Sequence, residues 1–219
     1  MAIALVSSGI GSMGISGGGT VAILNTLTAN LFVYSAGFFA TATPTDTQGN
    51  TWIPLTLHTG SGGVQHRIFY VLNPITAAGH GFSASGSNIY GSAAVWAFSD
   101  TVGTPTFESE NGSGGTGSSR QPGSVTPTIN GSLIISGVTI ASVQSSITAD
   151  SGLTVISYNG SSGIALAHGG GYLVQTTVAA INPTWSWGVS GDNAVSIAVF
   201  KPVVPVTTKE RTYLSVGLG

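Results

Sequence analysis

Residues 66–74 read His-Arg-Ile-Phe-Tyr-Val-Leu-Asn-Pro, and this stretch shows the pattern that decides the fold. Its apolar and aromatic run ends at an Asn-Pro pair, which is typical of a β-strand followed by a turn. Similar runs recur along the chain, bounded by Gly, Asn, Pro and Ser. No segment keeps helical spacing over three turns, and the helix formers Glu, Lys and Arg are almost absent. The sequence therefore predicts an all-β protein.

The expected strands form two sets, one in each half of the chain. The first set is Ala2–Val6, Val21–Leu24, Leu31–Ala40, Trp52–His58, His66–Leu72, Gly81–Ser85 and Ala93–Phe98. The second set is Ser132–Ile140, Leu153–Tyr158, Gly163–Ala167, Gly171–Val178, Thr184–Val189 and Ala194–Phe200. Asn-Gly pairs at Asn111, Asn130 and Asn159 predict tight turns, because both residue types tolerate positive φ.

A repeat with an offset of 102 to 104 residues relates the two sets. Leu31-Phe-Val-Tyr-Ser-Ala-Gly37 corresponds to Leu133-Ile-Ile-Ser-Gly-Val138, and Val95-Trp-Ala-Phe98 corresponds to Ile197-Ala-Val-Phe200. A constant offset across separate elements indicates a duplication. Either two tandem sandwiches or one sandwich built from a duplicated half fits this pattern. We favour the second, a jelly-roll-like or Greek-key β-sandwich made of two pseudo-repeated halves.

The sequence divides into three parts on this interpretation. Residues 1–19 form an N-terminal strand and a Gly-rich arm, either flexible or closely packed, with six glycines from Gly9 to Gly19. Residues 20–200 form the sandwich, with pseudo-repeats at about 20–100 and 124–200. The Gly/Ser-rich segment 99–122 is expected to be an exposed crossover loop. Residues 201–219 form a C-terminal arm.

Composition excludes several classes of function. The chain has 219 residues, only five Lys or Arg, seven Asp or Glu and no Cys. Five basic residues cannot neutralise a run of phosphates, so we expect no nucleic-acid partner. The mean hydropathy is +0.38, yet no apolar stretch reaches the ~20 residues that span a bilayer, so we expect no membrane insertion. The N-terminus also lacks the basic start of a secretory signal.

Three glycine motifs resemble enzyme signatures. Gly9-Ile-Gly-Ser-Met-Gly14 fits the dinucleotide-binding pattern, but no helix can follow it. Gly14-Ile-Ser-Gly-Gly18 fits a hydrolase nucleophile elbow, and His168-Gly-Gly-Gly171 resembles an oxyanion loop. The order of these two is the reverse of that in the hydrolase fold, and the helices are missing. We therefore expect that the protein is not an enzyme.

The titratable residues predict no cofactor and no metal site. His58 and His66 are expected to flank one hairpin, as surface or hydrogen-bonded histidines rather than metal ligands. Asp46 begins a segment that resembles a calcium loop but supplies a single carboxylate, so an Asp-initiated turn is favoured. Glu108 and Glu110 could share a strand face, yet their place in the Gly/Ser-rich segment favours a solvated role.

Four tryptophans are candidates for either the core or a binding surface. Trp185 and Trp187 are two residues apart and should point to the same face of a strand. On an exposed face they would form a platform for stacking sugars. Because the apolar Val189 continues that face, the core is favoured. Trp52 and Trp96 lie in strong strands and are also expected in the core.

Five stretches resemble β-sandwich modules of tailed-phage structural proteins and of bacterial secreted or surface proteins. They are Asp46-Thr-Gln-Gly-Asn-Thr-Trp52, Arg67-Ile-Phe-Tyr-Val-Leu-Asn-Pro74, Ala93-Ala-Val-Trp-Ala-Phe-Ser99, Gln121-Pro-Gly-Ser-Val-Thr-Pro127 and Asn182-Pro-Thr-Trp185. The resemblance covers both halves of the chain and implies no catalytic residue. It implies a virion structural protein, such as a capsid decoration protein or a head or tail surface protein, with copies of itself and other virion proteins as partners.

Two further expectations follow from this resemblance. The C-terminal arm would contribute to assembly, and its candidate residues are Lys209, Glu210, Arg211, Tyr213 and Leu214. The alternative function is a glycan-binding or adhesion module on a virion or cell surface, with host-surface glycans as ligands and Trp185 and Trp187 as the candidate stacking residues. The expected location is the virion, or the extracellular surface under the alternative.

Overall fold

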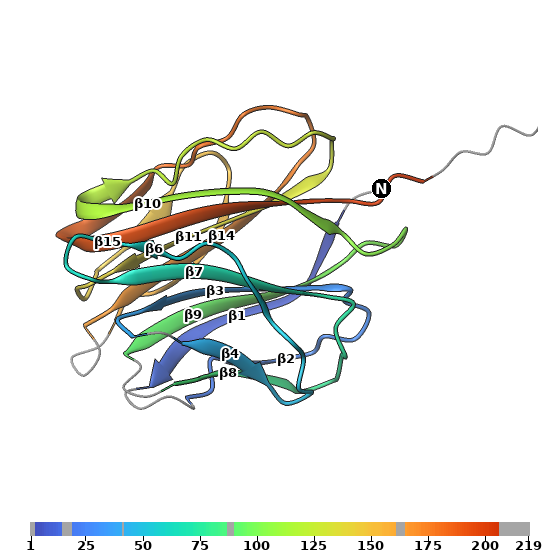
Figure 1. Cartoon of the computed structure of the whole chain (residues 1–219), viewed down its shortest axis with the longest axis horizontal. Helices are drawn as coiled ribbons and strands as arrows, with labels where there is room; N and C mark the ends of the chain where they lie inside the picture. The colour runs from blue at the N-terminus through green and yellow to red at the C-terminus, as the bar shows by residue number, and fades with distance from the viewer. Residues whose placement is uncertain (1–2, 15–18, 41, 87–89, 161–164, 206–219) are drawn as a thin grey trace, which may run out of the picture.

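The computed structural model describes residues 3–14, 19–40, 42–86, 90–160 and 165–205. These residues form fifteen β-strands in three antiparallel sheets, which confirms the all-β prediction. The sheets lie in layers, with the first sheet between the other two (Figure 1). Within these ranges no helix is long and apolar enough to cross a membrane.

Each half of the chain supplies one six-stranded sheet, and the first half also supplies a small third sheet. The first sheet has the order β1 (Ala4–Gly14), β9 (Gly91–Ser99), β3 (Leu31–Phe38), β7 (Gln65–Leu72) and β5 (Ile53–Pro54), with β6 (His58–Thr59) also on β7. The second has the order β10 (Thr106–Arg120), β15 (Trp185–Lys201), β11 (Ser132–Ile140), β14 (Ala167–Gln175) and β13 (Thr154–Tyr158), with β12 (Ile147–Ala149) also on β15. The third is β2 (Ala22–Leu24), β8 (His80–Ser85) and β4 (Thr43–Asp46).

The duplication read from the sequence is visible in the strand order. The order β1-β9-β3-β7-β5 of the first sheet matches β10-β15-β11-β14-β13 of the second, strand for strand. The two edge strands β1 and β10 therefore belong to the repeat. Each repeat unit thus begins earlier in the chain than the expected ranges 20–100 and 124–200. One hydrophobic cluster draws residues from both large sheets, so the two halves pack against each other through a shared apolar layer.

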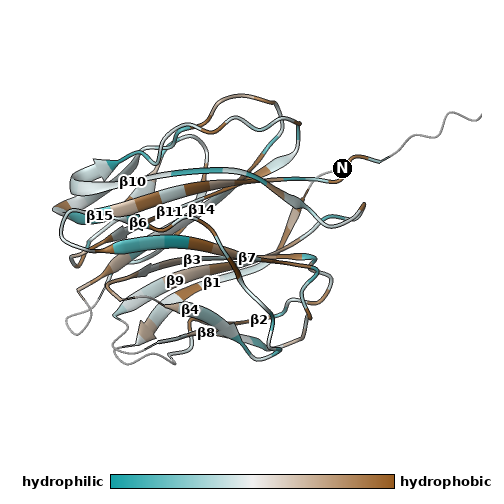
Figure 2. Ribbon diagram, in the orientation of Figure 1, coloured by the Kyte–Doolittle hydropathy of each residue, from teal (hydrophilic) through white to brown (hydrophobic). Residues whose placement is uncertain are grey.

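The first sheet is buried on both faces, and this explains its continuous apolar runs. Along β3, Leu31 and Val33 pack toward the second sheet, whereas Phe32 and Tyr34 pack toward the third. Every residue of β3 is buried. Strands covered on both faces lose the alternation of polar and apolar residues that marks a half-exposed strand. Figure 2 shows these hydrophobic strands in the interior of the layers.

The N-terminal glycines form a strand rather than an arm. Residues 4–14 pair with β9 along the edge of the first sheet. A Cβ on Gly9 would lie 2.6 Å from the Cβ of Ala22, and one on Gly11 would lie 2.5 Å from the carbonyl oxygen of Val21. These glycines therefore let the segment before and within β2 lie against β1. Residues 9–14 are therefore a closely packed edge strand and not a flexible arm, and residues 15–18 lie outside the described part.

The Gly/Ser-rich segment 99–122 is likewise a strand over most of its length. β10 pairs with β15 from Thr106 to Arg120, with two irregularities in the register. A Cβ on Gly112 would lie 2.3 Å from the His58 ring, so glycine there allows β10 to approach β6 closely. The prediction of a loop was therefore wrong, and so was the turn at Asn111-Gly112. Gly131 and Gly160, in the other two Asn-Gly pairs, do adopt positive φ.

Four smaller differences separate the expected strands from the observed ones. The two strands expected at 184–189 and 194–200 are one strand, β15, and the strand expected at 52–58 is divided into β5 and β6. The strand expected at 171–178 overlaps β14. Only Ala167 of the strand expected at 163–167 belongs to β14, because residues 165–166 are not in a strand and residues 161–164 lie outside the described part. The short strands β4 and β12 have too few apolar residues to be recognised.

Candidate functional site

The carboxylates are the first candidates for chemistry, and each of the six in the described ranges accepts a backbone N–H from elsewhere. Three of these contacts join the two halves: Glu110 accepts from Thr56, Asp192 from Val64 and Asp100 from Val203. The others are Asp46 with Gln48 and Asn50, Glu108 with Thr128, and Asp150 with Thr184. Glu108 and Glu110, for which a solvated role was expected, are partly exposed, and each also fixes a neighbouring segment against β10.

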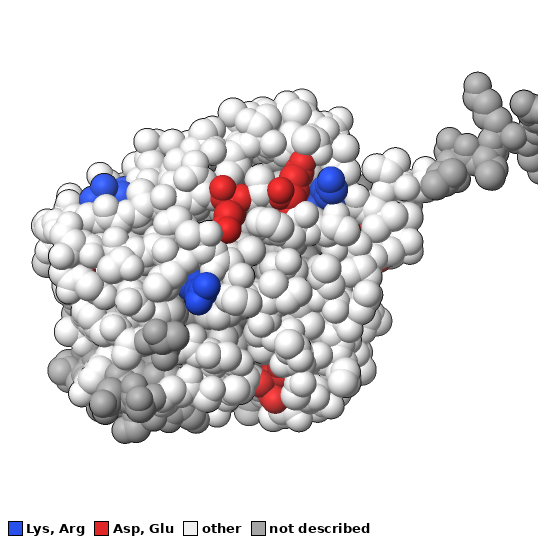
Figure 3. Space-filling view, in the orientation of Figure 1, with Lys and Arg blue, Asp and Glu red and all other residues white. Residues whose placement is uncertain are grey.

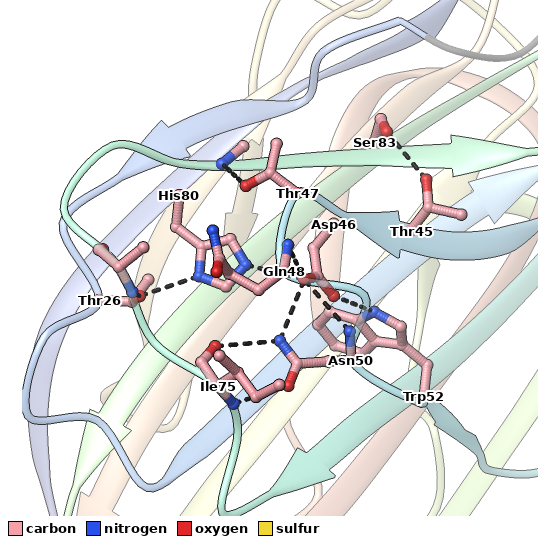
Figure 4. A network of polar contacts seen from close by, with 12 residues as sticks. Thr26, Thr45, Asp46, Thr47, Gln48, Asn50, Trp52, Ile75, His80 and Ser83 are labelled. Carbon is pink, nitrogen blue, oxygen red and sulfur yellow. Dashed lines mark hydrogen bonds and ion pairs between the residues drawn. The ribbon is translucent and has the colours of Figure 1, made fainter.

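Asp46 is the centre of a network of polar contacts (Figure 4). It ends β4, and its Oδ1 accepts hydrogen bonds from the backbone N–H of Gln48 at 3.0 Å and from Nδ2 of Asn50 at 3.0 Å. Its Oδ2 accepts one from Nε1 of Trp52 at 3.0 Å. These contacts form the Asp-initiated turn that the sequence predicts, and they join it to the core through the buried indole of Trp52.

His80 extends this network into an Asp-His-Thr arrangement. Its Nε2 lies 2.9 Å from Oδ1 of Asp46, and its Nδ1 lies 3.0 Å from Oγ1 of Thr26. The order resembles that of a nucleophilic triad. However, Thr26 is fully buried, and its hydroxyl also contacts the N–H and the carbonyl oxygen of Ala77. No substrate can reach it, so the arrangement joins three loops instead of activating a nucleophile.

The surroundings of Asp46 favour its ionised form. Burial would raise the pKa of Asp46, but the hydrogen bonds from His80 and from the Gln48 and Asn50 segment outweigh burial and hold the pKa below its usual value. A small depression of about 180 Å³ opens beside it, lined by Thr20, Asp46, Thr47, Gly81, Phe82 and Ser83. Both carboxylate oxygens already accept hydrogen bonds, and the described residues contain no cluster of three His, Cys, Asp or Glu that could hold a metal.

A second polar group lies between the two large sheets. His66 on β7 and His168 on β14 are fully buried, and their rings stack with centroids 5.4 Å apart. Ser35 on β3 bridges them, with its Oγ 2.9 Å from Nε2 of His66 and 3.3 Å from Nε2 of His168. The outer ring nitrogens reach Ser196 and Thr139 at 2.7 Å and 3.4 Å. His58 and His66 are also register partners, as the hairpin prediction requires.

This row of five groups can satisfy both imidazoles in their neutral form, which burial favours. Burial, followed by the neighbouring His168 and His58, holds the pKa of His66 well below its usual value, and burial lowers the pKa of His168 to about 3. A neutral imidazole has one donor and one acceptor nitrogen, so four protons can point along the row in a single sense. The network is therefore a structural contact between the sheets.

Glycines make room for these hydroxyl groups. A Cβ on Gly137 would lie 2.2 Å from Oγ of Ser35, and one on Gly37 would lie 2.0 Å from Oγ1 of Thr139. Each hydroxyl thus faces a glycine on the opposite sheet. The pairing is reciprocal, because residues 35 and 37 correspond in the repeat to 137 and 139.

The motif His168-Gly-Gly-Gly171 has a structural explanation. It lies within β14 and not in a loop. A Cβ on Gly170 would lie 2.5 Å from the ring of Trp96, and one on Gly169 would lie 2.8 Å from the ring of Trp185. Small residues are needed there because two tryptophan rings lie against the strand from opposite sides. Ser16, the candidate nucleophile of the other hydrolase motif, lies outside the described residues.

A third polar group forms a shallow depression at the end of β10. It has a volume of about 650 Å³ and is lined by Ser113, Ser119, Arg120, Gln121 and Thr184. The segments 121–127 and 182–185, two of the stretches that carry the resemblance, meet here. Nε2 of Gln121 donates to the carbonyl oxygen of Asn182, and the N–H of Gly123 donates to Oδ1 of Asn182.

No protein-family model, curated protein or solved structure matches the chain. Its function must therefore be inferred from its own geometry.

The remaining predicted site residues divide into two groups. Trp185 and Trp187 are 0% and 6% exposed, and both belong to a hydrophobic cluster of the second half. They lie in the core, as Trp52 and Trp96 do, and offer no surface for stacking a sugar. Val189, which was expected to continue the buried face, is exposed. The candidate assembly residues Lys209, Glu210, Arg211, Tyr213 and Leu214 lie outside the described residues.

Proposed function

We propose that this chain is a non-enzymatic structural protein of a phage virion, exposed on the capsid as a decoration protein or on the surface of the head or tail. The observation that carries the proposal is that the carboxylates and the buried histidines of the described residues make structural hydrogen bonds. All six described carboxylates fix backbone segments, and the three buried histidines lie in hydrogen-bonded contacts between strands and loops. These are the groups that an enzyme would use for acid–base or nucleophilic catalysis.

The surface agrees with a component that associates with copies of itself and with other virion proteins. On the face in Figure 3, few charged side chains interrupt a surface of other residues. Charged residues make up 5% of the chain. Contacts made by such a surface depend little on ionic strength, because few charges are available to be screened. A component with few charges can therefore stay attached to a particle as salt changes.

Density-gradient fractionation of the native source tests the proposal. We expect the protein to sediment with DNA-filled particles, and recovery as free protein or with cell envelopes would contradict it. Deletion of Thr207–Gly219 then tests the C-terminal arm. The shortened chain should keep its folded β-sheet spectrum but occupy fewer sites on each particle. Unchanged occupancy would rule out an assembly role for the arm and leave the virion location to the gradient.

The second candidate function is binding of a glycan, at an extracellular or virion surface. The buried tryptophans remove the stacking platform on which it first rested. The depression lined by Ser113, Ser119, Arg120, Gln121 and Thr184 supports it instead, because hydroxyl and amide groups match the hydrogen bonding of sugar hydroxyls. Binding on a broad glycan array would support this candidate, and its absence would contradict it.

A further inference from the structure

The depression at the end of β10 is held in shape by hydrogen bonds among its own residues. Oγ of Ser113 donates to the carbonyl oxygen of Gln121 at 2.6 Å. Nε2 of Gln121 donates to Oγ1 of Thr184 at 3.1 Å and to the carbonyl oxygen of Asn182 at 3.3 Å. These bonds connect residues as far apart as 121 and 184 in the sequence. A ligand would meet a preformed wall, which lowers the entropy cost of binding.

Several polar groups of this wall keep hydrogen-bonding capacity. Oε1 of Gln121 and the hydroxyl of Ser119 have no hydrogen-bond partner among the described residues, and both residues are exposed. Oγ1 of Thr184 accepts a bond from Gln121 and has a second lone pair for another donor, while its hydroxyl proton faces the carboxylate of Asp150. The depression therefore presents both donors and acceptors, as a polyhydroxylated ligand requires.

Arg120 gives the depression a positive charge. Its Nε donates to Oδ1 of Asn193 at 2.9 Å, and its Nη2 donates to the carbonyl oxygen of Thr116 at 3.3 Å. Within the described ranges no carboxylate forms an ion pair with it. Both partners are neutral, so the guanidinium is held in place without neutralisation. Its Nη1 and the second proton of Nη2 remain for a ligand.

Arg67 shows the contrast. Its Nε donates to the carbonyl oxygen of Leu55, and its guanidinium carbon lies 5.6 Å from the centre of the Phe69 ring. It lines neither of the two depressions described above. Of these two arginines, only Arg120 places a charge without an ion-pair partner among the described residues beside the hydroxyl and amide groups of a depression.

We propose that this depression binds an acidic saccharide, with Arg120 holding its carboxylate and Ser119, Gln121 and Thr184 contacting its hydroxyl groups. The planar guanidinium matches a carboxylate, and a charge-assisted hydrogen bond is about twice as strong as a neutral one. This inference rests on the second candidate function and specifies its ligand class. It is independent of the virion proposal, because a surface protein of a particle can also bind a glycan.

Titration calorimetry with the full chain tests it, using tetragalacturonate as the acidic probe and a galactose tetramer as the neutral one. The acidic probe should bind at least about tenfold more tightly, since the charged contact adds strength that a neutral hydroxyl lacks. Raising NaCl from about 50 mM to about 500 mM should lower the affinity for the acidic probe several-fold and leave the affinity for the neutral probe unchanged. Arg120→Gln should remove the preference, whereas the control Arg67→Gln should keep it.

A second variant protects the test against misfolding of Arg120→Gln. Ser119→Ala removes a hydroxyl that has no hydrogen-bond partner among the described residues, so it should weaken binding of both probes about equally in a chain whose thermal melting is unchanged. Equal binding of the two probes, or a preference that survives Arg120→Gln, overturns the acidic ligand and leaves saccharide binding in place. Binding of neither probe overturns the proposed site for both saccharide classes, and an empty glycan array would overturn the second candidate function itself.

Discussion

His66 and His168 stack on each other at 5.4 Å between the two large sheets, with their ring planes 13° apart. They are 102 residues apart, which is the offset of the repeat, so each imidazole is the counterpart of the other. Equivalent residues that meet in this way lie where the two halves face each other. The pair is therefore a direct contact between the duplicated halves, and it is sensitive to charge because neither ring has a buried carboxylate partner among the described residues.

Acid should destabilise the fold from about pH 6.5 downward. The pKa of both histidines is lowered in the folded state, so the unfolded chain binds more protons below its own pKa of about 6.5. Each of the two then removes ~1.4 kcal/mol of unfolding free energy per pH unit, down to its folded pKa. Urea unfolding at several pH values above about 4.5, where most carboxylates remain ionised, measures this slope.

His168→Gln supplies the control for that slope. Removing one imidazole should lower the slope of unfolding free energy against pH by ~1.4 kcal/mol per pH unit, which corresponds to one proton. This holds whatever the effect of the substitution on the stability at pH 7. His58, whose pKa burial also lowers despite the opposing effect of Glu110, contributes in the same direction and is present in both proteins. A stability that does not change between pH 6.5 and 4.5 would contradict the neutral network.

Ser35→Ala should destabilise the protein by about 2–3 kcal/mol, because it leaves Nε2 of both histidines without a buried partner. Ser92 is the matched control. It is also fully buried on a central strand, but its hydroxyl has no hydrogen-bond partner among the described residues. Ser92→Ala should therefore change the unfolding free energy by less than about 0.5 kcal/mol or increase it. Equal costs for the two variants, measured by chemical denaturation, would contradict the bridging role of Ser35.

Asp46→Ala should cost far more stability than Asp150→Ala, although the two residues are 104 positions apart and so match within the offset of the repeat. The side chain of Asp46 is fully buried and accepts bonds from Asn50, Trp52 and His80, so its loss should cost about 3 kcal/mol. Asp150 is exposed, and its main contact is the backbone N–H of Thr184, so its loss should cost about 1 kcal/mol. Thermal unfolding of the two variants compares them, and a larger effect at Asp150 would overturn this assignment.

Gly170→Ala should destabilise the second sheet by about 1–3 kcal/mol. Its Cβ would lie 2.5 Å from the ring of Trp96 and 2.9 Å from the Cβ of Ala94, both fully buried. The neighbouring Gly171 is the control, because a Cβ there would come no closer than 3.2 Å to another atom. The intensity and the wavelength maximum of tryptophan fluorescence should change in Gly170→Ala and not in Gly171→Ala. An unchanged melting temperature in Gly170→Ala would contradict close packing at this strand.

The sequence predicts those strands whose apolar residues dominate their stability. The strand Ser132–Ile140 has the expected bounds, because its nine buried residues form an unbroken run. β10 was missed for the opposite reason. It contains four glycines and four serines, and it forms a strand because β15 supplies the partner and β6 needs the space above Gly112. Local propensity cannot report such a contact, since it depends on a segment more than 50 residues away.

The candidate sites divide in the same way. The turn at Asp46 was predictable because its contacts to Gln48 and Asn50 are local. The histidine pair was hidden, although the repeat offset carried the signal: position 66 plus 102 is His168. The depression around Arg120 was not predictable, because Thr184 reaches it only through the meeting of two distant segments.

The third sheet exists on one side only, and this gives the molecule a polarity that its duplicated interior lacks. The two large sheets form a fused pair of equivalent units, much as two subunits would in a symmetric dimer. The strands β2, β8 and β4 cover the outer face of one unit, while connecting segments such as those joined at Val125 and Ile181 cover the other. The two broad faces are consequently different surfaces. A chain attached through one of them would present the other outward, in a single defined orientation.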